Sequence, residues 1–144
     1  GGTSVHLTGG VLAMVLLGPF SGLLIISCAL IMHALLFQHG GVLTLGANIL
    51  NIGVVNCVLG YYVYKMIPKA GLAWAGVVTW MGVITGAVFC TLELAFSNRL
   101  SPGVPVLSMA ITYSIAGLIE GLMTFSILTG IKKIRPDSLN LKKV

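Results

Sequence analysis

Two long apolar runs in the second half of the chain limit what it can fold into. Residues 71–96 contain one charged side chain, Glu93, and residues 103–131 also contain one, Glu120. A helix needs about 20 apolar residues to cross the ~30 Å hydrocarbon core of a bilayer, and both runs are longer. The strands of a membrane barrel would instead show short segments of alternating polarity. The sequence therefore predicts an all-α, polytopic membrane protein.

The composition agrees with a lipid environment. The 144 residues are 57% hydrophobic and only 8% charged, with a mean hydropathy of +1.06. Soluble domains carry about 25% charged residues. This chain has too few charges to cover a water-exposed surface, which excludes a soluble globular domain. No spacing of a nucleophile with a base is visible either, so we expect no enzymatic activity.

Turn residues and prolines divide the chain into about four to five helices. The expected helices cover residues 5–17, 20–37, 47–66, 70–96 and 104–134. Proline lacks an amide donor and disfavours helix at the residue before it, so Gly18–Pro19 ends the first helix. That helix would rise only about 20 Å at 1.5 Å per residue. A hairpin turning at Gly18–Pro19 is therefore favoured over one kinked span.

The chain shows no internal repeat and no linker. Residues 1–144 are therefore expected to form a single transmembrane domain. The chain opens on Gly-Gly, without a basic segment of the kind that begins a signal peptide, and we expect it to be the C-terminal portion of a longer protein. Two pairs of glycines predict close packing of helices. Gly82 and Gly86 are four residues apart, as are Gly117 and Gly121, and this spacing lets a neighbouring helix approach closely.

The basic residues are concentrated at two places. Lys65 and Lys69 flank one expected turn, and the other group lies near the C-terminus, at Lys132, Lys133, Arg135, Lys142 and Lys143. Cytoplasmic segments of membrane proteins carry an excess of lysine and arginine. Residues 132–144 are therefore expected to form a basic cytoplasmic tail. An arm that binds nucleic acid is the less favoured alternative, and we expect no nucleic-acid partner.

Two carboxylates lie within the expected spans. Glu93 is close to the outer end of its helix, whereas Glu120 is near the middle of the last one. Ionisable groups inside a bilayer are costly and are usually paired or functional. Glu120 is therefore either hydrogen-bonded to another helix or part of a transport pathway. The second interpretation leaves open a channel or proton-coupled carrier that uses Glu120 and Glu93 without ATP. An assembly subunit that binds no ligand also remains open.

Histidine and asparagine side chains lie mainly in the first part of the chain. The histidines are His6, His33 and His39, and no two of them have the i, i+4 spacing that places two imidazoles on one helical face. Asn48 and Asn51 are three residues apart and share a face of an α-helix. Spacing alone does not establish a metal site, and His33 is interpreted as a residue of the helical core.

Several short motifs occur in an order that is typical of one family. They read TSVHLTGG, LLGPFSG, ALLFQHGG and LGANILNIG, followed later by GYYVYK, LELA and IAGLIEGLMT. Together they resemble the CbiM/NikM family, the membrane subunits that capture substrate for energy-coupling-factor (ECF) transporters of cobalt or nickel. The resemblance runs through essentially the whole chain, and it implies a helical bundle like that of other ECF substrate-capture subunits.

The resemblance also implies a metal site. In that family, nitrogen atoms hold the ion in a near-square-planar arrangement. The donors are the amine of the start methionine, the amide and imidazole of a histidine next to it, and the imidazole of the histidine in the T-S-x-H-L segment. His6 occupies the last of these positions, and the remaining ligands are absent from this chain. Asn48 and Asn51 match a motif whose side chains would orient the ligands, and His39 is a further candidate.

Two positions depart from the family pattern. His33 stands where a glutamine is expected, and Tyr113 stands where a histidine is expected. These departures leave the role of His6 unaffected.

The implied function is the capture of a transition-metal ion outside the cell membrane of a bacterium or archaeon. Co(II), for cobalamin synthesis, or Ni(II) would be the transported substrate, since both accept nitrogen ligands. The subunit itself would be non-catalytic and hold no cofactor. Its expected partners are the ECF transmembrane coupling subunit, a pair of ABC-type ATPases, the lipid bilayer and, in some systems, a small accessory membrane subunit.

Overall fold

The computed structural model describes residues 7–37, 42–97 and 104–135, and these residues form helices without any strand. Four segments are long and apolar enough to cross a membrane, as predicted. The all-α, polytopic fold is thereby confirmed. In chain order the elements are α1 (Gly10–Leu17), α2 (Pro19–Leu36), η1 (Val42–Thr44), α3 (Leu45–Asn48), η2 (Ile49–Leu59), α4 (Gly60–Met66), η3 (Pro68–Ala70), α5 (Gly71–Phe96) and α6 (Val104–Ile134).

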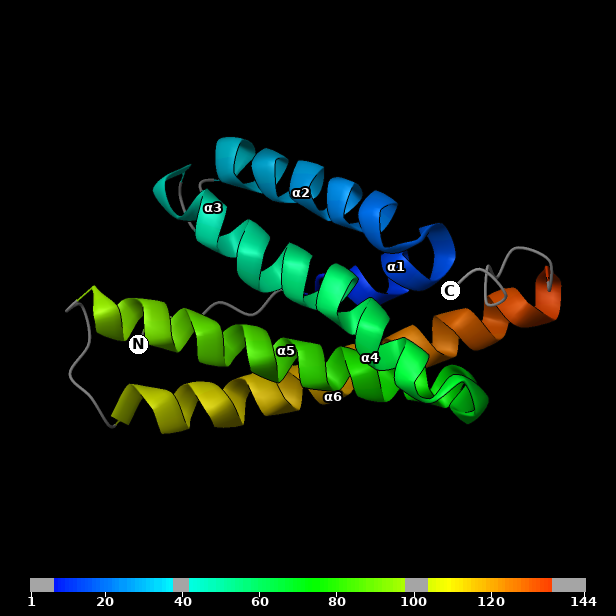
Figure 1. Cartoon of the computed structure of the whole chain (residues 1–144). Coiled ribbons are helices and arrows are strands. Elements are labelled where there is room, and N and C mark those ends of the chain that lie inside the picture. The colour runs from blue at the N-terminus through cyan, green and yellow to red at the C-terminus, as the bar shows by residue number, and fades with distance from the viewer. Residues whose placement is uncertain (1–6, 38–41, 98–103, 136–144) are drawn as a thin grey trace.

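Helices α1 and α2 form the predicted hairpin (Figure 1). Gly18 separates them with a φ of 94°, a conformation that favours glycine, and Pro19 begins α2. Gly22 of α2 lies directly against α1, because a Cβ atom there would be 3.0 Å from the backbone nitrogen of Met14. In a single kinked span these residues would be far apart, so the hairpin is confirmed and the kinked span is excluded.

Helix α1 is a short helix at the centre of the bundle. Its eight residues rise only about 12 Å, which is too short to cross a bilayer. Val11, Met14 and Val15 are completely buried against the surrounding helices. The predicted start at residue 5 is wrong at least for residues 7–9, which are not helical. Gly9 has a φ of 65°, which turns the chain just before α1 begins.

The segment predicted as one α-helix over 47–66 begins earlier and changes its geometry along its length. It opens with the 3₁₀ turn η1, passes through α3 and the π-helix η2, and ends as α4. A π-helix hydrogen-bonds residue i to i+5, is rare, and is frequent at functional sites. Its eleven residues include the buried side chains of Asn51 and Asn56.

Helices α5 and α6 are antiparallel and lie side by side (Figure 1). Their backbones meet at Gly76 and Gly121, where a Cβ atom on Gly121 would be 2.5 Å from the carbonyl oxygen of Gly76. The indole N–H of Trp80 donates a hydrogen bond to the carbonyl oxygen of Ser114 at 3.2 Å. The predicted close packing at the glycine pairs is confirmed, since Gly82, Gly86 and Gly117 also contact neighbouring helices.

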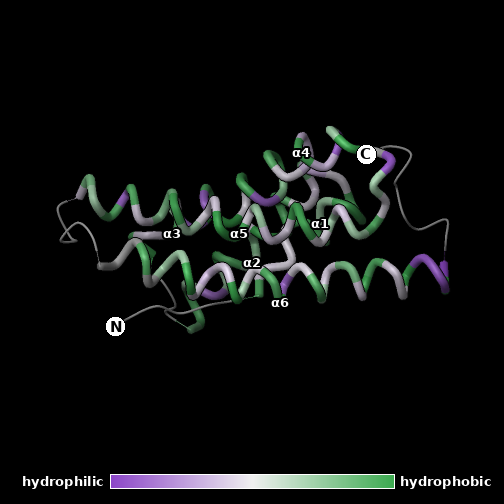
Figure 2. Tube along the Cα trace, turned by 90° about the horizontal axis from the view of Figure 1, so that it is seen from below, coloured by the Kyte–Doolittle hydropathy of each residue, from purple (hydrophilic) through white to green (hydrophobic). Residues whose placement is uncertain are grey.

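The basic residues at the described ends of α4 and α6 lie at the same end of the bundle. Lys65 is in the last turn of α4, and Lys132 and Lys133 are in the last turn of α6. These helix ends lie together in Figure 1, and Figure 2 shows hydrophilic colour at the end of α6. The arrangement agrees with one common side for both groups. That this side is cytoplasmic stays a prediction, and residues 136–144 of the tail lie outside the described residues.

Replacement of Gly121 by alanine is expected to destabilise the protein. The added Cβ would collide with the backbone of Gly76, which cannot turn away as a side chain could. Overpacking of this kind costs about 1–3 kcal/mol. Thermal unfolding in detergent should therefore occur at a lower temperature for Gly121→Ala than for the wild type.

Gly130 of the same helix provides the control, because no atom lies within 4 Å of a Cβ placed there. Gly130→Ala should leave stability unchanged or raise it by up to about 1 kcal/mol, through the better helix propensity of alanine. Equal effects of the two substitutions would contradict the packing assigned to Gly121.

Candidate functional site

A cavity with several polar side chains in its wall lies among four segments that are distant in the sequence. Its volume is about 100 Å³, enough for a few water molecules or a small ligand, since a water occupies about 30 Å³ in the liquid. The residues before α1, the α3–η2 segment, α5 and α6 each contribute to its wall. The lining residues are Thr8, Asn48, Asn51, Ile52, Asn56, Gly82, Val83, Gly86, Ala87, Cys90, Tyr113, Ala116 and Glu120.

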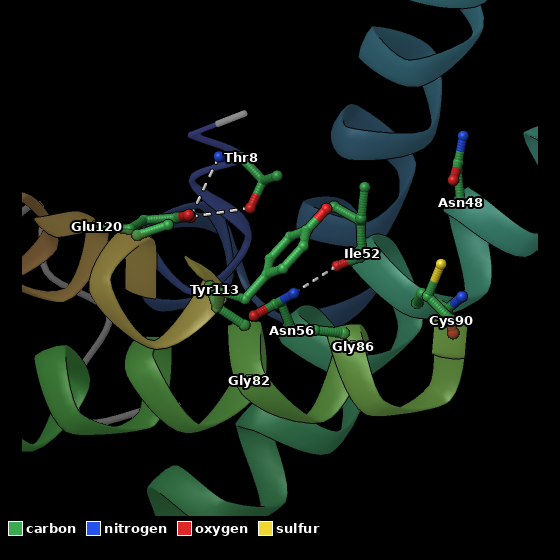
Figure 3. A pocket seen from close by; sticks show the side chains of 13 residues that line it. Thr8, Asn48, Ile52, Asn56, Gly82, Gly86, Cys90, Tyr113 and Glu120 are labelled. Atoms are coloured by element: carbon green, nitrogen blue, oxygen red, sulfur yellow. Dashed lines mark hydrogen bonds between the residues drawn. The ribbon is translucent and has the colours of Figure 1, made fainter. Parts of the chain in front are cut away.

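Glu120 holds the chain just before α1 (Figure 3). Its Oε1 atom accepts three hydrogen bonds: from the amide of Thr8 at 3.2 Å, from the hydroxyl of Thr8 at 2.8 Å and from the amide of Gly9 at 2.8 Å. The amides at the start of a helix have no partner within the helix, and in a membrane water does not supply one. A carboxylate is a strong acceptor for such groups. The expected hydrogen bonding of Glu120 to another part of the chain is therefore confirmed.

Glu93 connects α5 with η2 in a similar way. The side-chain amide of Asn51 donates a hydrogen bond to Glu93 Oε2 at 2.9 Å. Asn51 is buried, whereas Glu93 is only half-buried. Both carboxylates of the apolar spans are thus tied to groups that line or approach the cavity.

Two buried side-chain oxygens have no hydrogen-bond partner in the described part of the chain. They are the Oδ1 atoms of Asn51 and Asn56. The amide nitrogen of Asn56 donates to the carbonyl oxygen of Ile52 at 3.0 Å, which leaves its oxygen as the available acceptor. A buried acceptor without a partner costs about 1–3 kcal/mol. Both oxygens belong to residues that line the cavity, so a hydrogen-bond donor that reached them from that side would stabilise them.

Glycines bring the asparagine-bearing segment into close contact with its neighbours. A Cβ atom at Gly82 would collide with the side chain of Asn56, and one at Gly86 would be 2.7 Å from the carbonyl oxygen of Asn51. Gly10 at the start of α1 lies on the other side of Asn56, with a Cβ position 2.6 Å from Asn56 Cβ. Any larger residue at these positions would displace the asparagines that line the cavity.

Sequence reasoning identified Asn48 and Asn51 but not Asn56. Asn48 and Asn51 both line the cavity, although Asn48 is only half-buried, and their expected role in orienting metal ligands stays a prediction. In an α-helix, residues five apart point about 140° away from each other. In the π-helix η2, residues five apart are hydrogen-bonded across one turn, and Asn51 and Asn56 line the same cavity. An asparagine within an apolar span was the signal that could have drawn attention to Asn56.

Of the three histidines singled out from the sequence, the structure describes only His33. His6 and His39 lie outside the described residues, but Thr8, two positions after His6, lines the cavity. His33 is exposed on α2 with its ring edge-on to Phe37, at a centroid distance of 5.6 Å. Its interpretation as a core residue is wrong, because α2 packs on α1 and η2 through other positions. Within the described ranges, no group of three or more His, Cys, Asp or Glu side chains could hold a metal.

Tyr113 lines the cavity, although it departs from the family pattern. Figure 3 places its ring between Glu120 and the Asn56–Ile52 region.

Comparison with known proteins identifies the family. Residues 1–138 match a family model described as "CbiM: Cobalt uptake substrate-specific transmembrane region". The chain is 37% identical over 145 residues to the putative fused nickel transport protein NikMN of Archaeoglobus fulgidus, a match that covers 99% of the chain and 49% of that protein. It is 34% identical over 153 residues to a putative metal transport protein of Methanocaldococcus jannaschii, with 99% of the chain and 69% of the relative covered.

A third relative is the cobalt transport protein CbiM of Sorangium cellulosum. It is 33% identical over 153 residues, covering 99% of the chain and 68% of the relative. The chain thus spans about half the length of the Archaeoglobus protein and about two thirds of the other two. No solved structure matches. From the match over residues 1–138 and from these relatives, the chain belongs to the CbiM family of cobalt uptake transmembrane proteins.

Proposed function

We propose that the protein is the membrane subunit that captures Co(II) or Ni(II) for import into the cell. The observation that carries this proposal is the match of residues 1–138 to the cobalt uptake substrate-specific transmembrane region. Relatives named as cobalt and as nickel transport proteins support both ions as substrates. Selection between the two ions depends on site geometry, since imidazole nitrogen suits both.

His6 is the proposed metal ligand of this chain. Support comes from its place in the T-S-x-H-L segment and from the position of Thr8, which lines the polar cavity two residues later. The remaining nitrogen ligands of the family pattern are not among the residues of this chain. Asn48 and Asn51 are proposed to orient the ligand segment from the cavity wall, a role that the unpartnered, buried Oδ1 atom of Asn51 supports.

Energy for import would come from partner proteins. The proposed partners are the ECF transmembrane coupling subunit and a pair of ABC-type ATPases, with a small accessory membrane subunit in some systems. The protein itself would catalyse no reaction and would sit in the cell membrane of a bacterium or archaeon with its basic C-terminal tail in the cytoplasm. The relatives named as transport proteins support a non-catalytic role.

Substitution of His6 by alanine in the full-length protein is expected to abolish tight binding of Ni(II) and Co(II). Loss of a direct ligand should lower metal affinity by more than the roughly 10–100-fold that follows the loss of a residue that only orients a ligand. Equilibrium titration of the purified protein in detergent measures this. His33→Ala is the matched control, because His33 lies on the exposed face of α2, away from the cavity lining. Unchanged affinity in His6→Ala would refute the proposed ligand.

Asn51→Ala is expected to weaken metal binding without abolishing it, by about 10–100-fold. The substitution removes both the donor to Glu93 and the unpartnered oxygen at the cavity. Glu93→Ala separates the two effects, since it removes the acceptor of the Asn51 side-chain amide and leaves the Asn51 oxygen in place. If Glu93→Ala weakened binding as much as Asn51→Ala, the lost hydrogen bond alone would account for the effect, and the proposed role of the Asn51 oxygen would be wrong.

Transport in vesicles distinguishes an ATP-driven system from a proton-coupled carrier that uses Glu120 and Glu93. Vesicles that contain the protein, the coupling subunit and the ATPases should accumulate Ni(II) or Co(II) only when ATP is supplied on the side of the membrane where the ATPases are bound. Vesicles with this protein alone should show no flux. Flux without the ATPases, driven by a proton gradient and lost in Glu120→Gln, would favour the carrier instead.

A further inference from the structure

We propose that Glu120 is a positioning residue for metal capture: by binding Thr8 and Gly9, it fixes the backbone that follows His6. The inference rests on the proposed function, and it assigns to Glu120 an effect on metal affinity that operates through the ligand segment. The carboxylate lies on α6, 112 residues further along the chain than Thr8, so only the tertiary fold brings them together.

The geometry makes this contact a strong restraint. All three hydrogen bonds converge on a single carboxylate oxygen, and two of the donors are backbone amides, which a change of side-chain rotamer cannot move. Glu120 is itself only 5% exposed, and hydrogen bonds to a carboxylate are stronger where water is excluded. Two residues of chain span at most about 7 Å, so a fixed Thr8 limits the positions that His6 can reach.

The next residues are held by independent contacts, which makes the anchor rigid. The thiol of Cys57 donates a hydrogen bond to the carbonyl oxygen of Gly10 at 3.3 Å. Gly10 also lies against the Asn56 side chain, as described above, and Val11 is completely buried. The start of α1 is therefore fixed on one side by η2 and on the other by Glu120. Without Glu120, Thr8 and Gly9 would lose the three hydrogen bonds that hold them to α6.

Two substitutions of Glu120 separate the effect of its charge from the effect of its side-chain shape. Glutamine keeps the length of the side chain and one carbonyl oxygen, but it is a neutral and weaker acceptor. Alanine leaves the donors of Thr8 and Gly9 without this partner. A positioning role therefore predicts that glutamine restores part of what alanine loses. A role in carrying protons predicts that both substitutions abolish function equally, because neither side chain titrates.

The experiment is a double-mutant cycle in the full-length protein. Ni(II) and Co(II) affinities are measured by equilibrium titration, and the ligand field of bound Co(II) is followed by its visible absorption spectrum. Glu120→Ala is expected to lower affinity by about 10–100-fold, the range found for partners that orient ligands, and to change the spectrum. Glu120→Gln should fall between alanine and the wild type. Thr8→Val, which removes one of the three donors, should cause a smaller loss.

The effects of the Thr8 and Glu120 substitutions on metal affinity should not be additive, and this coupling is what the positioning role specifically predicts. If the Thr8 hydroxyl acts through Glu120, Thr8→Val should have little further effect when Glu120 is already alanine. Thr79→Val is the matched control, because Thr79 is buried but its hydroxyl bonds only the carbonyl oxygen of Ala75 within α5. That variant should bind metal like the wild type, with the same spectrum.

Wild-type affinity and spectrum in Glu120→Ala would overturn the inference, as would fully additive effects of Thr8→Val and Glu120→Ala. If Glu120→Ala does not fold, Glu120→Gln and Thr8→Val still test it, and wild-type behaviour in both would overturn it. Metal binding by the wild type that is lost in His6→Ala but kept in Glu120→Ala would leave the proposed function intact and refute only the positioning role. Absence of metal binding by the wild type would refute both.

Discussion

The hydrogen bonds that Glu120 accepts from Thr8 and Gly9 solve the main physical problem of this fold. Helix α1 begins inside the bundle, and its first amides would be left without partners in an apolar environment. One buried carboxylate oxygen accepts the donors that precede it. The amides of Thr8 and Gly9 are thereby satisfied, and the short helix that follows them buries Val11, Met14 and Val15 at the centre of the structure. The other helices pack around it.

Close contacts between glycines and asparagines hold the π-helix η2 in its place. Gly10, Gly82 and Gly86 allow the π-helix η2 to approach α1 and α5 so closely that no side chain would fit between them. The same approach buries Asn51 and Asn56 and leaves an acceptor oxygen on each without a partner among the described residues. Such oxygens are costly in an apolar protein. Their presence at one cavity is an argument for a ligand or chain segment that carries donors, and the proposed metal-binding segment has that chemistry.

The carboxylates of the two longest spans have structural partners. Glu93 binds Asn51, and Glu120 binds the residues before α1. Both interactions connect the α5–α6 pair to the segments that carry the proposed site residues. A capture subunit needs this kind of connection, because an ion bound by nitrogen ligands is held only as firmly as the backbone that supplies them.

The sequence by itself determined the membrane class, the apolar spans and the close packing at the glycine pairs, and it favoured the hairpin at Gly18–Pro19 over one kinked span. The order of its motifs also identified the family. Each of these depends on local composition or on spacing along one helix. His6 and His39 stay predictions, since they lie outside the described residues. The helix ends were less well determined, because Thr8 and Gly9 bind Glu120 from outside the helix, a long-range contact that local propensity does not contain.

Only the tertiary structure decided which polar groups meet. The pairing of Thr8 with Glu120, that of Asn51 with Glu93, and the inward position of Asn56 depend on how each helix is rotated about its axis. A helix that is apolar all around carries no periodic signal for that rotation. The π-helical geometry of η2 further changed which asparagines share a side. Composition could therefore place these helices in the membrane, but the contacts between them were needed to find the site.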